Sequence, residues 1–158
     1  MTNLLTLRRA QESDVNQIYW LRRRTFEQIN AVNLNPEIVM IVNTMNNPRR
    51  ILEKIQDRDA FCLIKSTDEY EEILGIVDIK EYRINEPPVI SGLFVRHGYL
   101  RKGCGTLLMD FIENYAKEKG AQKVKLSSTR YARNFYLNRG YKPQVPSTST
   151  LTMEKKLR

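Results

Sequence analysis

The sequence contains few of the residues that cross-link small proteins, since its 158 residues include only two cysteines. Neither Cys62 nor Cys104 has a partner at the spacing of metal ligands, and each stands inside a periodic segment. Two such thiols exclude a disulfide framework and are typical of a reduced cytoplasm. Histidine is scarcer still, and the only one, His97, falls in a turn, where we expect a solvated side chain rather than a catalyst.

Long apolar runs are also missing, because no stretch approaches the roughly 18 residues that a membrane span needs. The N-terminus, MTNLLTLRRAQESD, lacks the basic region followed by an apolar region that a secretory signal requires. Repeats and linkers rich in Pro, Gly or Ser are absent too. We therefore expect a single soluble, cytoplasmic domain over residues 1–158, which is long enough to bury an ordinary core.

Negative charge is scarce in the C-terminal part of the chain. Residues 1–95 carry 12 Lys and Arg against 14 Asp and Glu, whereas residues 96–158 carry 14 against 4. This asymmetry indicates an anionic partner for the second part, either nucleic acid or a phosphorylated cofactor. A generically basic surface is the alternative.

Hydrophobic periodicity predicts alternating strands and helices. Helices are expected from Val15 onward, over 36–56 with a break at Pro48, over 104–119 and over 130–140. In the helix over 104–119, we place Leu107 on the apolar face and Glu113 away from it. Six strands are expected, at 4–8, 61–65, 72–80, 89–95, 123–128 and 150–157. The order predicts an α+β or mixed α/β sandwich.

A glycine-rich turn stands directly before the helix over 104–119, in the stretch VRHGYLRKGCGT (95–106). The first backbone N–H groups of a helix lack partners and the helix dipole adds to their field, so such a turn indicates an anion site. Phosphate is the natural ligand.

Two known phosphate motifs do not match this turn. Gly98 and Gly103 have the spacing of the nucleoside-triphosphate loop, but Cys104 and Gly105 stand where that loop needs Lys and Ser or Thr. The segment GCGTLL begins like a dinucleotide fingerprint, but Leu108 replaces its third glycine. A plain structural turn stays open at this point.

Two longer segments resemble the signatures of the GNAT superfamily of N-acetyltransferases. The segment LFVRHGYLRKGCGTLLM resembles the acyl-CoA pyrophosphate loop of that family, Arg/Gln-x-x-Gly-x-Gly/Ala after a bulged strand. Downstream, ARNFYLNRGYK resembles the second signature, Ala-x-x-Phe-Tyr-x-x-x-Gly-Phe/Tyr, with Ala132 standing 27 positions after Gly105. The resemblance covers nearly the whole chain. It implies a GNAT-like acyl-CoA N-acyltransferase fold, a central mixed and mostly antiparallel sheet flanked by about four helices.

The resemblance also implies acetyl-CoA as cosubstrate and no metal. Phe94 and Val95 would present backbone to the pantetheine arm, as an added strand would. Leu100 stands where the family has Arg or Gln, and Arg101 where Gly is common, but backbone amides do not depend on those side chains. Cys104 is expected to be a core thiol. The residues that would cradle the pyrophosphate are Leu100, Arg101, Lys102, Gly103, Cys104, Gly105 and Thr106.

Tyr136, in the second signature, is the candidate general acid. Acyl transfer expels a thiolate whose parent thiol titrates near about 8.5, and a phenol with a pKa of about 10 is still protonated at neutral pH and can supply that proton. A tyrosine that only packs in the core is the alternative. The adjoining Phe135 is expected in the core.

The general base is harder to identify, and the amount of base needed depends on the acceptor. At neutral pH an alkyl amine must lose a proton at a cost of roughly 4–5 kcal/mol, whereas an α-amino group needs only about 1 kcal/mol. Strand 89–95 offers only Ser91, so the base would come from Asp78, Glu81 or Glu86, or act through water. We choose Glu81, at the end of a central strand. A solvated strand-end charge is the alternative.

These residues predict an acetyl-CoA-dependent N-acetyltransferase in which a primary amine attacks the thioester directly in a ternary complex. The acceptor is a small-molecule amine or a peptide or protein amine, with contacts expected in about residues 25–40 and 142–150. The alternative is a GNAT-like basic module that binds nucleic acid or regulates without catalysis, and a third hypothesis is a phosphate-binding structural subunit. Since no basic stripe with interleaved aromatic residues occurs, we do not expect nucleic acid as a partner, nor a membrane; a homodimer stays open.

Overall fold

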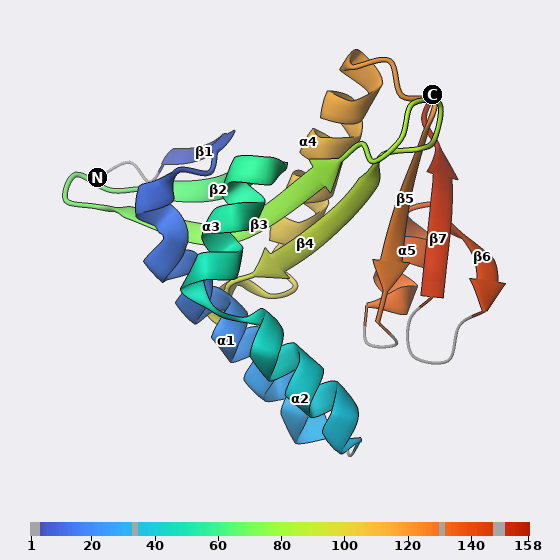
Figure 1. The fold of residues 1–158 in the computed structure, drawn as a ribbon. Coiled ribbons are helices and arrows are strands. Elements are labelled where there is room, and N and C mark those ends of the chain that lie inside the picture. The colour runs from blue at the N-terminus through green and yellow to red at the C-terminus, as the bar shows by residue number, and fades with distance from the viewer. Residues whose placement is uncertain (1–3, 33–34, 130–131, 147–150) are drawn as a thin grey trace. The chain divides into compact units, whose positions relative to one another are not determined.

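The computed structural model describes residues 4–32, 35–129, 132–146 and 151–158 (Figure 1). Its strands form one sheet in the order β1-β2-β3-β4-β5-β7-β6. The pairing of β4 with β5 is parallel, whereas β1 with β2, β5 with β7 and β6 with β7 are antiparallel. The expected mixed, mostly antiparallel sheet flanked by helices is therefore confirmed. The chain divides into two compact units, Met1–Asp78 with Gly92–Met109 (unit 1) and Ile79–Ser91 with Asp110–Arg158 (unit 2).

Unit 1 holds the N-terminal helices and most of the first four strands. Three α-helices follow the first strand. One short 3-10 turn precedes the first of them, and another precedes the helix that begins at the end of the unit. In chain order, its elements are β1 (Leu4–Arg9), η1 (Glu12–Asp14), α1 (Val15–Val32), α2 (Pro36–Met45), α3 (Pro48–Asp57), β2 (Asp59–Ser66), most of β3 (Glu71–Lys80), the end of β4 (Val89–Val95), η2 (His97–Tyr99) and the start of α4 (Cys104–Glu118).

The predicted break in the second helical region separates α2 from α3. Each of these helices begins with proline, and the side chain of the preceding asparagine accepts a hydrogen bond from the backbone within the first turn, from Glu37 N to Asn35 and from Arg50 N to Asn47. Proline at the first helical position and asparagine at the N-cap are both favoured there. The chain therefore forms five α-helices in its described part rather than about four.

The core of unit 1 lies between α1, α3 and the strands β2 and β3. Ile18 and Leu21 of α1 and Ile51 of α3 are at most 2% exposed and pack with buried residues of both strands. Figure 1 shows α3 lying across these strands. Since β2 and β3 are buried almost throughout, they read as continuous apolar runs, which explains why their positions were predictable.

Unit 2 consists of the segment after β3, the beginning of β4, the rest of α4 and the C-terminal elements β5 (Lys123–Ser128), α5 (Arg133–Asn138), β6 (Lys142–Pro146) and β7 (Leu151–Lys156). The predicted helix over 130–140 corresponds to α5, and residues 130–131 lie outside the described residues. The strand β6 was missed because Pro143 and Pro146 removed its strand pattern. It is an edge strand, which is where a sheet tolerates proline.

Two assignments on α4 were wrong. Leu107, placed on the apolar face, is 44% exposed, and Glu113, placed off that face, is buried. The buried face of the helix is formed by Leu108, Ile112 and Ala116, with Met109. Glu113 is tolerated beside this face because its carboxylate is fully paired, as described below. No helix within the described residues is long and apolar enough to span a membrane.

Candidate functional site

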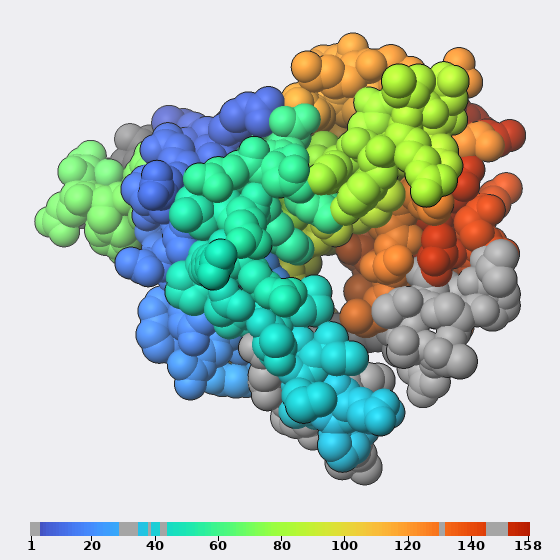
Figure 2. Space-filling model, in the orientation of Figure 1, coloured from blue at the N-terminus to red at the C-terminus, as the bar shows by residue number. Residues whose placement is uncertain are grey.

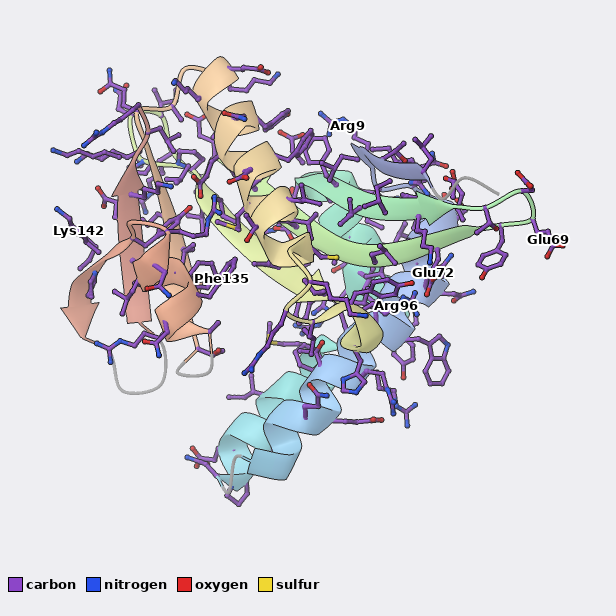
Figure 3. The ribbon with its side chains drawn as sticks, turned by 180° about the vertical axis from the view of Figure 1, so that it is seen from behind. Arg9, Glu69, Glu72, Arg96, Phe135 and Lys142 are labelled. Carbon is purple, nitrogen blue, oxygen red and sulfur yellow. The ribbon has the colours of Figure 1, made fainter. Side chains whose placement is uncertain are left out.

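Unit 1 contains the glycine-rich turn, and Arg96 anchors its start. The backbone N–H of Arg96 donates to Leu74 O at 2.7 Å, and its Nε donates to Ile73 O at 2.7 Å. Its guanidinium also donates to Gln17 Oε1 and forms an ion pair with Glu72. Figure 3 shows Arg96 and Glu72 side by side. Because β3 and α1 both hold this arginine, the chain leaves β4 in a defined direction.

The turn itself adopts the backbone conformations that a glycine-rich loop needs. Gly103 has φ +87° and Arg101 has φ +59°, although Arg101 is not glycine. The left-handed region disfavours residues with a Cβ, so Arg101 occupies a backbone position that suits glycine better. A Cβ built on Gly103 would meet nothing within 4 Å. This backbone is therefore open to a ligand.

The helix α4 begins at Cys104, directly after the turn, and its hydrogen-bond ladder starts with Leu107 N donating to Gly103 O at 3.0 Å. The amides of the first turn have no intrahelical acceptor. Cys104 is buried, and burial raises the pKa of its thiol, so this cysteine is a core residue rather than a nucleophile. Burial likewise raises the pKa of the Cys62 thiol, to about 12.

Positive charge gathers around Tyr99 in the turn. Lys65 of β2 donates from Nζ to the Tyr99 hydroxyl at 3.2 Å, and this hydrogen bond raises the pKa of Lys65. Lys102 lies over the same ring, with Nζ 5.7 Å from the centroid. Arg101 and Lys102 are exposed. Sequence reasoning missed Lys65, because only the fold brings this residue of a distant strand to the turn.

The strand β4 supplies the other predicted cofactor contacts. Its described parallel pairing with β5 consists of Val89 with Lys125 and Ile90 with Leu126, so this ladder does not include Phe94 and Val95. On the β3 side, a Cβ placed on Gly75 would lie 2.9 Å from Phe94 O. Glycine at position 75 therefore lets the end of β4 approach β3 closely.

Unit 2 contains the second signature, with Tyr136 on α5. Its side chain is 8% exposed, and burial raises the pKa of its phenol to about 12. The ring makes edge-to-face contacts with Phe135 and Tyr141, at centroid distances of 5.2 and 5.7 Å. The Tyr136 hydroxyl donates no hydrogen bond to any residue that the structure describes. Tyr136 therefore holds its proton over the whole physiological range.

A buried ion-pair network holds the end of α5 against α4. Glu113 accepts hydrogen bonds from Tyr141 Oη at 3.0 Å, from Arg139 Nη2 at 3.0 Å and from Lys155 Nζ at 2.7 Å. Arg139 also pairs with Asp110 at 2.7 Å. Gly140, with φ +92°, ends the helix, and Tyr141 N donates back to Tyr136 O at 3.1 Å. This network fixes the segment that carries Tyr136.

The carboxylates considered as general base have different surroundings. Glu81 follows the end of β3, as expected, and is exposed, and Glu86 is exposed as well. In Figure 2 the segment that contains both, coloured yellow-green, lies on the surface. Asp78 is 3% exposed and accepts a hydrogen bond from Arg58 Nη1 at 3.0 Å. The Asp78 carboxylate is thus buried and held by a guanidinium, whereas Glu81 and Glu86 face solvent.

His97, as expected, is an exposed turn residue, and its Nδ1 contacts the side-chain amide of Gln28. No cluster of three or more potential metal ligands occurs among the described residues. The two segments expected to contact the acceptor, 25–40 and 142–150, lie partly outside the described residues, at 33–34 and 147–150.

The whole chain was compared with protein families, curated proteins and solved structures. The sequence profile of the acetyltransferase (GNAT) domain matches residues 33–151. No curated protein matches the chain by sequence.

Several solved structures share the fold. The PaiA N-acetyltransferase of Thermoplasma acidophilum, solved in complex with coenzyme A, has a TM-score of 0.81 and 20% identity, over 97% of this chain and 99% of its own. A GCN5-related N-acetyltransferase of Rhodopseudomonas palustris has a TM-score of 0.80 and 20% identity, over 99% of both chains. The N-acetylglutamate synthase of Neisseria gonorrhoeae, complexed with coenzyme A and N-acetyl-glutamate, has a TM-score of 0.73 and 17% identity, over 100% of this chain and 36% of its own.

Proposed function

Since the chain belongs to the GNAT acetyltransferase family, whose profile matches residues 33–151, we propose that it is an acetyl-CoA-dependent N-acetyltransferase that acts on a primary amine. The backbone of the turn before α4 carries the proposal. Arg101 and Gly103 are both left-handed, the space over Gly103 is open, and the first-turn amides of a helix follow directly. This combination suits the oxygen atoms of a pyrophosphate.

The residues present fit coenzyme A. The amides of residues 101–106 would hold the pyrophosphate, with Arg101, Lys102 and Lys65 supplying positive charge around it. Leu100, at the family's Arg or Gln position, is 39% exposed and offers no polar group, so the contact there is made by its backbone. Phe94 and Val95, outside the described β4–β5 ladder, would pair with the pantetheine amides.

The reaction needs one proton removed from the amine and one delivered to sulfur. In our proposal the amine nitrogen attacks the thioester carbonyl, the C–S bond breaks, and Tyr136 gives its phenolic proton to the departing thiolate. Glu81 takes the ammonium proton beforehand, directly or through water. The second N–H proton leaves the nitrogen as the C–S bond breaks and, through water, restores the proton that Tyr136 gave to sulfur. The buried phenol keeps its proton well above neutral pH, which supports its assignment as the acid.

Acetyl transfer is tested by the release of free coenzyme A thiol from acetyl-CoA, with an acceptor panel of polyamines, aminoglycosides, amino acids and peptide N-termini. We expect at least one class to give thiol and acetylated amine in equal amounts. The competing hypothesis is a basic binding module of the same fold. It is supported instead if no acceptor reacts and if single-stranded DNA, but not acetyl-CoA, raises the melting temperature at matched ionic strength.

A further inference from the structure

Unit 1 contains a small hollow between α1, α3, β3 and the end of β4, with room for about one water molecule or one carboxylate oxygen. Apolar side chains such as Ile18, Ile51 and Ile76 form much of its wall. Three charged residues also line it, Arg22 of α1, Lys54 of α3 and Asp78 of β3. Charged side chains in an apolar hollow are costly unless they are paired, so each of them needs an account.

Arg22 is incompletely paired. Its side chain is 4% exposed, and its Nε has no hydrogen-bond partner among the described residues. Its guanidinium lies over the rings of Phe26 and Phe94, with Cζ 5.5 and 5.0 Å from the centroids. Aromatic faces stabilise the positive charge, but they leave an N–H in the guanidinium plane without an acceptor. Burial accordingly lowers the pKa of Arg22.

Lys54 and Arg58 increase the excess of positive charge. Burial lowers the pKa of Lys54, whose ammonium has no hydrogen bond or ion pair with the described residues. Among the described residues that line the hollow, Asp78 is the only carboxylate, and its Oδ1 pairs with Arg58 Nη1 at 3.0 Å. Its Oδ2 faces Gly92. Arg22 Nε and the Lys54 ammonium therefore have no hydrogen-bond acceptor among the described residues, and an added anion would supply one.

We propose that the hollow binds a carboxylate through Arg22 Nε and the Lys54 ammonium, and that the acceptor amine supplies this carboxylate. The preferred acceptor is then an amino acid or a similar amine that bears a carboxylate. This inference rests on the proposed function. Phe94 supports the connection, because its ring lines the hollow while its backbone is a proposed contact of pantetheine. A carboxylate held there is close to the strand along which the thioester would lie.

The kinetic test uses amines that differ only in the carboxylate: lysine with cadaverine, arginine with agmatine, and tyrosine with tyramine. A charge-assisted hydrogen bond is worth about 1.5–3 kcal/mol, so we expect kcat/KM to favour the carboxylate member by about 10- to 100-fold in at least one pair. Lys54→Met and Arg22→Met should lower this ratio about 10-fold or more by raising KM for the acceptor. The KM for acetyl-CoA should not change. Arg50→Met, on the exposed side of α3, is the matched control and should retain the ratio.

A binding measurement separates this inference from the proposed function. Sodium acetate, compared with sodium chloride at equal ionic strength, should raise the melting temperature of the wild type and of Arg50→Met, but not of Lys54→Met. If acetate stabilises the protein in this way but no acceptor is acetylated, the carboxylate site is supported and the proposed function is refuted. The inference is overturned if acetate has no specific effect and the decarboxylated amines are equally good acceptors, because the hollow then holds only water or chloride.

Discussion

At the scale of single residues, burial supports the role that we propose for Tyr136 without establishing it. An apolar surrounding disfavours the phenolate, and the resulting pKa of about 12 keeps the proton on the side chain at any pH at which the protein works. The same burial would be expected of a tyrosine that only fills the core. Only a substitution that keeps the ring and removes the hydroxyl distinguishes the two roles.

We therefore expect Tyr136→Phe to fold and to bind acetyl-CoA like the wild type, because its edge-to-face contacts with Phe135 and Tyr141 are preserved. General acid catalysis contributes typically about 10²–10⁴-fold, so kcat with the best acceptor should fall by that factor. Tyr70→Phe, at an exposed tyrosine, is the control and should leave kcat unchanged. A Tyr136→Phe enzyme with wild-type kcat would exclude the hydroxyl from the mechanism.

Gly103 permits a second test of a single residue, because Gly120 provides a matched control. Both are left-handed, with φ +87° and +93°, and a Cβ on either would meet nothing within 4 Å. Valine at either position should cost about 1–3 kcal/mol of stability through backbone strain alone. Only Gly103→Val places a side chain over the proposed pyrophosphate site, so only this variant should lose acetyl-CoA affinity in calorimetry. Equal affinities for the two variants would refute the assignment of the turn.

At the scale of elements, the second signature is held by a network that its own residues only partly supply. Arg139 and Tyr141 lie within the signature, but their shared acceptor, Glu113, is on α4, and Lys155 is on β7. Three side chains thus converge on one buried carboxylate of α4. Removal of that carboxylate leaves two buried or half-buried cations without their main partner, which is costly.

Glu113→Gln should therefore lower the free energy of unfolding by about 3 kcal/mol, measured by urea denaturation. Its effect on kcat should follow from the displacement of α5 and should be smaller than that of Tyr136→Phe. Glu118→Gln, at an exposed glutamate of the same helix, is the control and should change stability by less than about 0.5 kcal/mol. If both variants unfold at the same urea concentration, the network is not a determinant of stability.

The elements that could be predicted from the sequence are those with a strong local signal. β4 and β5 were predicted at their observed bounds, and Asn47-Pro48 marked the beginning of α3, because apolar periodicity and proline chemistry act within a few residues. β6 was not predictable, since its prolines imitate a loop and only its edge position permits them.

The residues of the candidate site also differ in how far a local sequence signal reveals them. The glycine-rich turn could be located from its residue spacing alone, whereas Lys65 and the hollow around Arg22 depend on contacts between residues distant in sequence. A basic residue among apolar neighbours on α1 gives no sign of whether it snorkels to solvent or stays buried. The pairing of Glu113 was hidden for the same reason, because its partners follow it by 26 to 42 positions.

At the scale of the whole molecule, several buried groups should together lower the free energy of unfolding at alkaline pH. Burial raises the pKa of Cys62 from 9.0 to about 12 and that of Tyr136 from 10.0 to about 12, and it also raises the pKa of Tyr141. Above its ordinary pKa, each group has lost its proton in the unfolded chain while keeping it in the folded protein. The folded state then binds more protons, so stability falls as pH rises. Lys54, whose pKa burial lowers, acts in the opposite direction.

We expect the free energy of unfolding from urea denaturation to be highest near neutral pH and to decrease between pH 9 and pH 12, by up to about 1.4 kcal/mol per pH unit for each such group. The contributions begin at different pH values, which makes them separable. Cys62→Ala should flatten the decrease from pH 9 upward, where the thiols of Cys62 and Cys104 titrate in the unfolded chain, and Tyr136→Phe should flatten it only above pH 10. Tyr82→Phe, at an exposed tyrosine, should keep the wild-type slope. If stability is constant from pH 8 to pH 11 in the wild type and in both variants, these groups do not stay protonated in the folded protein. The proton of Tyr136 would then be less firmly held than its proposed role as general acid requires.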